Sequence, residues 1–135
     1  MVLVDSSAWI EFFLHFQHEP THPLHALGEE QRLATNWVIR VEILTGVKDE
    51  VAYAQLDKEL RALRQLPLTE DVWERAARLR WELRRRGVRV AVPDMVIACC
   101  AIEYECELFH LDHHFDVIAH HAPLKLYRLA KHPRQ

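Results

Sequence analysis

The sequence predicts a three-layer α/β/α domain with a mainly parallel central sheet. Short apolar runs alternate along the chain with longer segments of helical periodicity, which is the pattern of βαβ units. Parallel strands of this kind are covered by helices on both faces. No internal repeat, low-complexity segment or linker divides the 135 residues, so we expect one domain spanning residues 1–135.

The first strand is expected at Val2–Val4, which is apolar and ends at Asp5. Ser6 and Ser7 then offer an N-cap for a helix. Four aromatic residues mark its buried face at helical spacing: Trp9, Phe12, Phe13 and Phe16. The first unit is therefore a strand that leads directly into an amphipathic helix.

The next unit follows a loop over His18–His25 and a short helical segment. Leu33–Thr35 is the candidate second strand. Asn36 is a candidate cap for a helix over Trp37–Thr45, and Gly46 suits its C-terminal end. A longer helix is expected next, with one apolar face: Tyr53, Leu56, Leu60 and Leu63.

The third strand is weak in the sequence. Leu66–Leu68 is an edge strand at best, because Pro67 has no N–H to donate to a neighbouring strand. Thr69 is expected to cap another helix, which Gly87 ends. That helix has one apolar face at helical spacing: Val72, Ala76, Leu79 and Leu83.

The last part of the chain contains an apolar helix between extended segments. Pro93 and Asp94 follow the extended segment 88–92 and open a helix that is expected to run to about Cys106. Leu108–Leu111 and Leu124–Tyr127 are the last two expected strands.

Composition excludes several classes of protein. Half of the residues are hydrophobic, yet no apolar run approaches the roughly 20 residues of a membrane span. The start of the chain has no basic region ahead of its apolar residues, so we expect no signal peptide. Cys99, Cys100 and Cys106 form no CxxC pair and are odd in number, which indicates reduced, buried thiols in a cytoplasmic protein and no zinc site.

Charge excludes one mode of nucleic-acid binding. The formal net charge of −3 argues against a protein that holds nucleic acid by bulk positive charge, but not against an enzyme that cuts it. The ten histidines form no HExxH frame and are expected mostly at the surface.

Four acids stand out by position. Asp5 ends the first strand, Asp112 ends the Leu108–Leu111 strand, Asp94 lies in the first turn of a helix, and Glu42 lies within an apolar helix. Ligands of such sheets bind beyond the carboxyl ends of the strands. Four carboxylates there would repel one another, and a divalent cation would remove the repulsion. Oxygen ligands favour Mg²⁺ or Mn²⁺, which activate water beside a phosphodiester.

Each acid also has a simpler interpretation. Asp5 could cap a helix, Asp94 could interact favourably with a helix dipole, Asp112 could be a loop acid, and Glu42 could be solvated. The residues alone leave these alternatives open.

The segments around the four acids resemble the PIN-domain family, and within it the VapC-like toxins, in order and spacing over nearly the whole chain. They read VDSSAWI from Val4, VEILTG from Val41, PDMVIA from Pro93 and LDHHF from Leu111, which is followed by DVIA. The resemblance implies a PIN-like fold and an endoribonuclease that is the toxin of a VapBC-like pair.

The resemblance also implies roles for residues and partners. Asp5, Glu42, Asp94 and Asp112 would surround Mg²⁺ or Mn²⁺, and Ser6 would orient a water or a ligand carboxylate. The substrate would be RNA, such as tRNA or rRNA. A VapB-like antitoxin would silence the enzyme, in some pairs by placing a basic side chain in the acidic site, and the toxin would form a homodimer.

This chain departs from the family at the fourth acid. The family commonly has Thr-x-Asp-x-Asp-Phe, whereas His110 and His114 replace the threonine and the second aspartate here. His114 could hold a water, contact a phosphate or be tolerated variation.

Basic residues are concentrated between positions 75 and 89. Arg84, Arg85 and Arg86 are candidates for RNA binding, together with His114, and could equally be a solvated helix end. Trp37 and Trp81 are expected to pack in the interior, and part of the aromatic surface could bury an antitoxin helix.

Two alternatives to a nuclease remain. A phosphoacceptor receiver domain has similar length and acids at strand ends, but usually has an acidic pair after its first strand and a late Lys-Pro, which this chain lacks. A catalytically silent PIN domain that only binds a partner is the other, and an assay of RNA cleavage distinguishes it.

Overall fold

The central sheet has five strands in the order β3-β2-β1-β4-β5. All four strand pairs are parallel, so the predicted parallel sheet is confirmed. This computed structural model describes residues 1–128 of the chain. The strands are β1 (Val2–Val4), β2 (Leu33–Thr35), β3 (Arg64–Gln65), β4 (Glu107–Phe109) and β5 (Lys125–Leu126).

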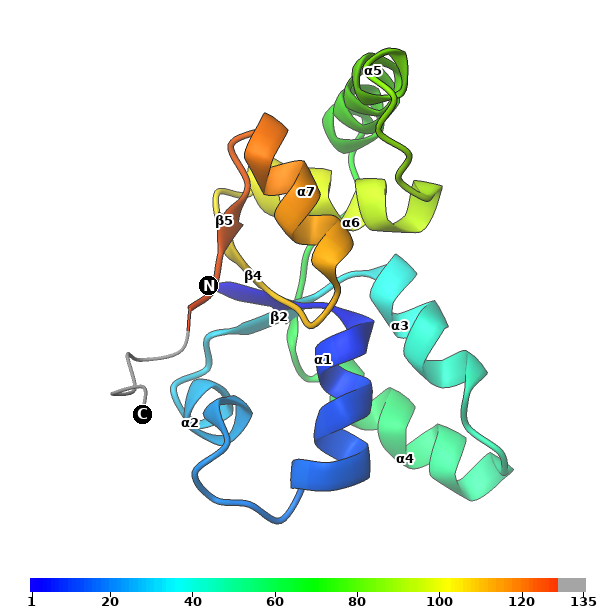
Figure 1. Cartoon of the computed structure of the whole chain (residues 1–135). Helices are drawn as coiled ribbons and strands as arrows, with labels where there is room; N and C mark the ends of the chain where they lie inside the picture. Colours follow the sequence, from blue (N-terminus) through cyan, green and yellow to red (C-terminus); the bar gives the residue numbers. More distant parts are fainter. Residues whose placement is uncertain (129–135) are drawn as a thin grey trace.

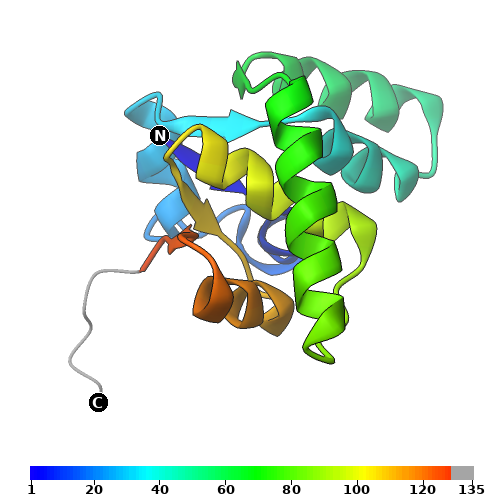
Figure 2. The ribbon, with the colours of Figure 1, turned by 90° about the horizontal axis from the view of Figure 1, so that it is seen from above.

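Helices cover both faces of the sheet, as predicted. Figure 1 shows α5 and α6 above the sheet and α1 and α2 below it, and the view from above in Figure 2 places α5 and α6 in front. The helical elements are α1 (Ser6–Glu11), the π-helical turn η1 (Phe12–Phe16), α2 (Pro23–Glu29), α3 (Trp37–Thr45), α4 (Glu50–Arg61), α5 (Glu70–Arg85), α6 (Val92–Glu103) and α7 (His113–His121).

The strand order places a switch point beside β1. The chain adds β2 and β3 on one side of β1, and then returns to add β4 and β5 on the other side. In an open parallel sheet, a ligand site forms where the order reverses, beyond the carboxyl ends of these strands. Receiver domains have the strand order 2-1-3-4-5, whereas the order in this sheet is 3-2-1-4-5. The receiver interpretation of this chain is therefore wrong.

The core is one cluster of buried residues that includes all of β1 and most of the apolar helix α6. All three residues of β1 are fully buried, and so is most of α6. The cysteines are buried and unpaired, which confirms the expectation of free thiols. Burial raises the pKa of Cys99 to about 12 and that of Cys100 to about 11, so both remain thiols at neutral pH and neither is an activated nucleophile.

Within residues 1–128, every helix is too short or too polar to cross a bilayer. This finding agrees with the absence of a long apolar run in the sequence.

The third strand is displaced from its predicted position. It occupies Arg64–Gln65 rather than Leu66–Leu68, and Leu66 adds one further hydrogen bond by donating its backbone N–H to Thr35 O at 2.9 Å. The pairing stops there because Pro67 has no N–H to donate.

Three details of the helices also differ from the prediction. The side chain of Asp5 caps α1, not a serine, because its carboxylate accepts from Ser7 N. The helix that follows passes into the π-helical turn η1. Helix α6 ends at Glu103 instead of about Cys106.

Helix α7 was not expected from the sequence. It begins in a polar run, and its buried face consists only of Phe115 and Ile118. As a result, Asp112 caps a helix and does not end a strand, because β4 already ends at Phe109.

Two tryptophans are more exposed than predicted. Trp37 is 54% exposed and Trp81 is 52% exposed, so neither packs in the interior. Guanidinium groups cover their rings instead: Arg40 lies 3.7 Å from the ring centre of Trp37, and Arg78 and Arg85 each lie 5.0 Å from that of Trp81.

Candidate metal centre

Asp5 lies at the switch point of the sheet. Its backbone N–H donates to Phe109 O at 2.9 Å, which holds the residue beside the carboxyl end of β4. The residue is only 3% exposed, and Oδ2 accepts from Ser7 N at 2.9 Å and from Ser7 Oγ at 2.6 Å. Oδ1 is buried and has no hydrogen-bond partner among the described residues. A buried carboxylate oxygen without a partner is costly, and a bound cation would satisfy it.

Glu42 reaches the same place from α3. Asn36 fixes the start of this helix by accepting from Ile39 N at 3.0 Å. One turn later, the carboxylate of Glu42 accepts at Oε1 from Ser6 Oγ at 2.8 Å. Because Ser6 directly follows Asp5, this hydrogen bond holds the two carboxylates near each other. Burial raises the pKa of Glu42, the hydrogen bond from Ser6 opposes the shift, and the charges of Asp5 and Asp94 add to it.

Asp94 lies in the first turn of α6, after Pro93 has preset the backbone for a helix. Its side chain is mostly buried. Burial raises the pKa of Asp94, the charges of Asp112 and Asp5 raise it further, and His114 opposes the shift. The position therefore disfavours an unpaired negative charge.

Asp112 comes from the loop between β4 and α7. Its backbone N–H donates to His110 Nδ1 at 3.0 Å, and its own Oδ1 accepts from His114 N at 2.9 Å. The loop is thus fixed on both sides of the carboxylate. His110 makes this bond from the position where the family has threonine.

The four predicted acids are electrostatically coupled. Asp5 and Asp94 act on Glu42, and Asp5 and Asp112 act on Asp94. The carboxylates come from four separate elements and act on one another at one end of the sheet, but among the described residues only Asp112, His113 and His114 form a group of three whose ligand atoms all lie within 4.8 Å of one another. The mutual repulsion and burial of the four acids are the features that a divalent cation would relieve. Their oxygen atoms suit a hard cation such as Mg²⁺ or Mn²⁺.

His114 lies between two of these acids. Its Nδ1 is 3.1 Å from Asp112 Oδ1 and 3.5 Å from Asp94 Oδ2. The sequence suggested an RNA contact for His114, and the structure places its imidazole against Asp94 and Asp112.

Ser7 is a residue that the sequence did not single out for the site. While its hydroxyl donates to Asp5, its Oγ also accepts from Leu111 N at 3.0 Å. It therefore joins the loop after β1 to the loop after β4. A hydroxyl two residues after an acid suggests the local hydrogen bond, but the contact with Leu111 spans 104 residues and needs the folded chain.

The three candidate RNA-binding arginines lie at the C-terminal end of α5. Arg84, Arg85 and Arg86 have no acidic partner within 4 Å in the described part of the chain, whereas Arg75 pairs with Glu103 and Arg78 pairs with Glu82. No arginine is among the charges that act on Glu42 or Asp94. The three arginines therefore make no ion pair within the described residues, although Arg85 lies over the ring of Trp81.

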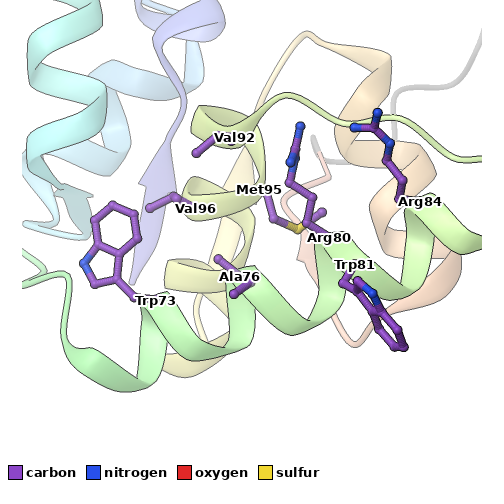
Figure 3. A pocket seen from close by; sticks show the side chains of 9 residues that line it. Trp73, Ala76, Arg80, Trp81, Arg84, Val92, Met95 and Val96 are labelled. Atoms are coloured by element: carbon purple, nitrogen blue, oxygen red, sulfur yellow. The ribbon is translucent and has the colours of Figure 1, made fainter.

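Arg84 also lines a pocket of about 450 Å³ between α5 and α6. Figure 3 shows Trp73 and Trp81 toward opposite ends of it, with Met95 and Val96 from α6 on the facing wall. Arg80 is fixed nearby, because its Nε donates to Val90 O at 2.8 Å. The pocket combines aromatic and apolar walls with positive charge.

Comparison with known proteins identifies the same family as the motifs. The family model described as PIN domain matches residues 2–121. A VapC ribonuclease of Mycobacterium bovis is 32% identical over 123 residues, which cover 88% of this chain and 92% of that protein. The ribonuclease VapC11 of Mycobacterium tuberculosis matches with the same identity and coverage.

Solved structures support the fold. VapBC2 from Rickettsia felis, bound to a DNA fragment from its promoter, matches with a TM-score of 0.75 and 18% identity, over 94% of this chain and 98% of that chain. VapBC-1 from nontypeable Haemophilus influenzae also has a TM-score of 0.75, with 17% identity over 94% of this chain and 97% of that chain. From the sequence match over most of its length and from its strand order and helical layers, we conclude that the chain belongs to the PIN-domain family and, within it, to the VapC-like proteins.

Proposed function

We propose that this protein is a divalent-metal-dependent endoribonuclease and the toxin of a VapBC-like pair, with RNA as its substrate. The observation that carries the proposal is the buried Oδ1 of Asp5, which has no partner in the described chain and lies among carboxylates whose charges act on one another. The relatives named as ribonucleases support the same activity.

The residues have distinct roles in this proposal. Asp5, Glu42, Asp94 and Asp112 hold Mg²⁺ or Mn²⁺, and Ser6 orients the carboxylate of Glu42 through its 2.8 Å hydrogen bond. When bound, the cation supplies an activated water and offsets negative charge on the phosphate. The chain's own contribution is a partly buried, oxygen-lined position where, within residues 1–128, no lysine or arginine pairs with the four acids.

Replacing Asp5 by asparagine is expected to reduce RNA cleavage by at least about 100-fold, since even outer contacts of a metal site are worth 10–100-fold. Total cellular RNA incubated with Mg²⁺, Mn²⁺ or EDTA provides the assay, and Asp71→Asn is the matched control because Asp71 is exposed on α5. Equal cleavage by wild type and Asp5→Asn would contradict the proposal. If the protein binds metal but cleaves no RNA, it is a silent PIN domain. If it cleaves RNA, mapping the ends of the fragments identifies the RNA that is cut.

We also propose that Arg84, Arg85 and Arg86 contact RNA phosphates, because they make no ion pair within the described residues. A triple change of Arg84, Arg85 and Arg86 to alanine is expected to weaken RNA binding and to reduce the slope of log K against log salt by about 0.7 for each lost contact with a single strand. Fluorescence anisotropy at several salt concentrations measures this slope. The double change Arg75→Ala and Arg78→Ala is the control, because both arginines are already paired with acids; an equal effect of both variants would contradict the assignment.

We propose that the antitoxin docks in a groove next to Glu42. A pocket of about 470 Å³ lies between α1, η1, α3 and α4, and it includes Phe13, Leu14 and Glu42 in its walls. An amphipathic segment could cover the apolar part and place a basic side chain at Glu42. The solved VapBC assemblies that share the fold support an antitoxin as the occupant.

We further propose that the toxin is a homodimer and acts in the cytoplasm, where its thiols stay reduced.

A further inference from the structure

The imidazole of His114 lies where a metal ligand would be expected. Its Nδ1 is within 3.5 Å of two carboxylate oxygens, Oδ1 of Asp112 and Oδ2 of Asp94. The Nδ1 atom is itself buried and makes no hydrogen bond within the described residues. It is therefore a buried nitrogen whose nearest polar neighbours are carboxylate oxygens of two of the four acids.

The separations agree with those between ligands of one cation. Metal–donor distances of about 2.1 Å place neighbouring donors about 3.0 Å apart in an octahedron and about 3.4 Å apart in a tetrahedron. The distances from Nδ1 are 3.1 Å to Asp112 and 3.5 Å to Asp94. Both distances from Nδ1 are thus those of neighbouring ligands, whereas Asp94 is not in the group of described ligand atoms that all lie within 4.8 Å of one another, so Asp94 and Asp112 would have to approach each other when an ion binds.

A second, independent observation points to a ligand in the same place. Asp5 is 3% exposed, and its Oδ1 has no partner in the part of the chain that the structure describes. The charge of Asp5 raises the pKa of Asp94, so Asp5 lies close enough to Asp94 to belong to the same group of acids.

The neighbouring His113 is a poorer candidate. Ligand atoms of Asp112, His113 and His114 do lie within 4.8 Å of one another. However, the side chain of His113 is 78% exposed, and its Nδ1 is 3.9 Å from Asp112 with no contact to Asp94. Of these two histidines, His114 is the one that lies within 4 Å of both acids.

We propose that His114 Nδ1 is a ligand of the divalent ion, together with Asp94 and Asp112, and that this nitrogen shifts the preference of the site from Mg²⁺ toward Mn²⁺ and other first-row transition ions. The inference rests on the proposed function, since it concerns the ion held by the four acids. An imidazole nitrogen is a softer donor than a carboxylate oxygen, and transition ions accept it more readily than Mg²⁺ does.

Electron paramagnetic resonance of the Mn²⁺-loaded protein tests the nitrogen ligand directly. The ¹⁴N modulation in the electron spin echo is expected for wild type and is expected to disappear in His114→Asp, which restores the acid common in the family. His120→Asp is the matched control, because His120 lies exposed in the last turn of α7, and His113→Gln tests the neighbouring ring. Both are expected to keep the modulation.

Calorimetric titration with Mn²⁺ and with Mg²⁺ gives the selectivity. The ratio of the two affinities is expected to fall at least about tenfold in His114→Asp and to stay unchanged in His120→Asp. Mn²⁺ binding without nitrogen modulation, or loss of the modulation in His113→Gln, would overturn the inference and leave the proposed function intact. No binding of either ion to wild type would overturn both.

Discussion

Replacing Asp94 by asparagine is expected to have opposite effects on activity and on stability. RNA cleavage should fall by at least about 100-fold, because the variant loses one carboxylate of the proposed metal centre. The metal-free protein, in contrast, should become more stable at neutral pH. Burial and the charges of Asp112 and Asp5 both disfavour the ionised form of Asp94 in the folded state.

The pH dependence gives the sign of the stability effect. Since the pKa of Asp94 is raised in the folded state, the unfolded chain ionises first as the pH rises. The free energy of unfolding of the wild type therefore falls from its acid-side value until the pH passes the raised pKa. Asparagine does not ionise, so this contribution is absent in the variant.

Urea denaturation of wild type and Asp94→Asn in EDTA measures this difference in stability. The measurement is made at two pH values, one below the ordinary aspartate pKa and one at neutral pH. The gain in stability should be present at neutral pH and should vanish on the acid side. Asp71→Asn is the control, because Asp71 is exposed on α5 and makes no ion pair within the described residues. A variant that is less stable than wild type at neutral pH would show that Asp94 is not under repulsion.

Truncating Phe115 to alanine is expected to cause the largest loss of stability, about 3–5 kcal/mol, as for other buried phenylalanines. Phe115 is fully buried, and its ring centre lies 5.2 Å from that of His110. The cavity would loosen the start of α7 and with it the loop that carries Asp112.

Urea or thermal unfolding of Phe115→Ala measures this loss. Val117→Ala on the same helix is only partly buried and should cost much less. A Phe115→Ala protein with wild-type stability would mean that α7 does not pack on the core as described.

Much of the architecture follows from local patterns in the sequence. The fully buried run Val2–Val4 and the apolar helix after Pro93 predicted a sheet covered on both faces, and both occur. Asn36 predicted the start of α3 correctly, and Gly87 adopts the left-handed φ of 82° that ends α5. These signals depend on a few neighbouring residues, so no tertiary information is needed.

The acids could be named from the sequence because their motifs are local, but their contacts could not. The hydrogen bond between Ser6 and Glu42 joins residues that are 36 positions apart, and the position of His114 between two acids depends on how α6 and α7 meet. Helix α7 was missed because only two of its residues are buried. Trp37 and Trp81 were misplaced because hydrophobicity alone does not reveal the guanidinium groups that cover them.

The central claim, that four carboxylates together bind a divalent cation, is tested most directly by thermal unfolding with and without metal. Binding to the folded state alone at 100 times Kd stabilises it by about 2.7 kcal/mol, which corresponds to a rise in Tm of roughly 5–15 °C. We expect such a rise for wild type with Mn²⁺ or Mg²⁺ and none for Asp5→Asn. An unchanged Tm of the wild-type protein at millimolar metal, or an equal rise in Asp5→Asn, would contradict the account.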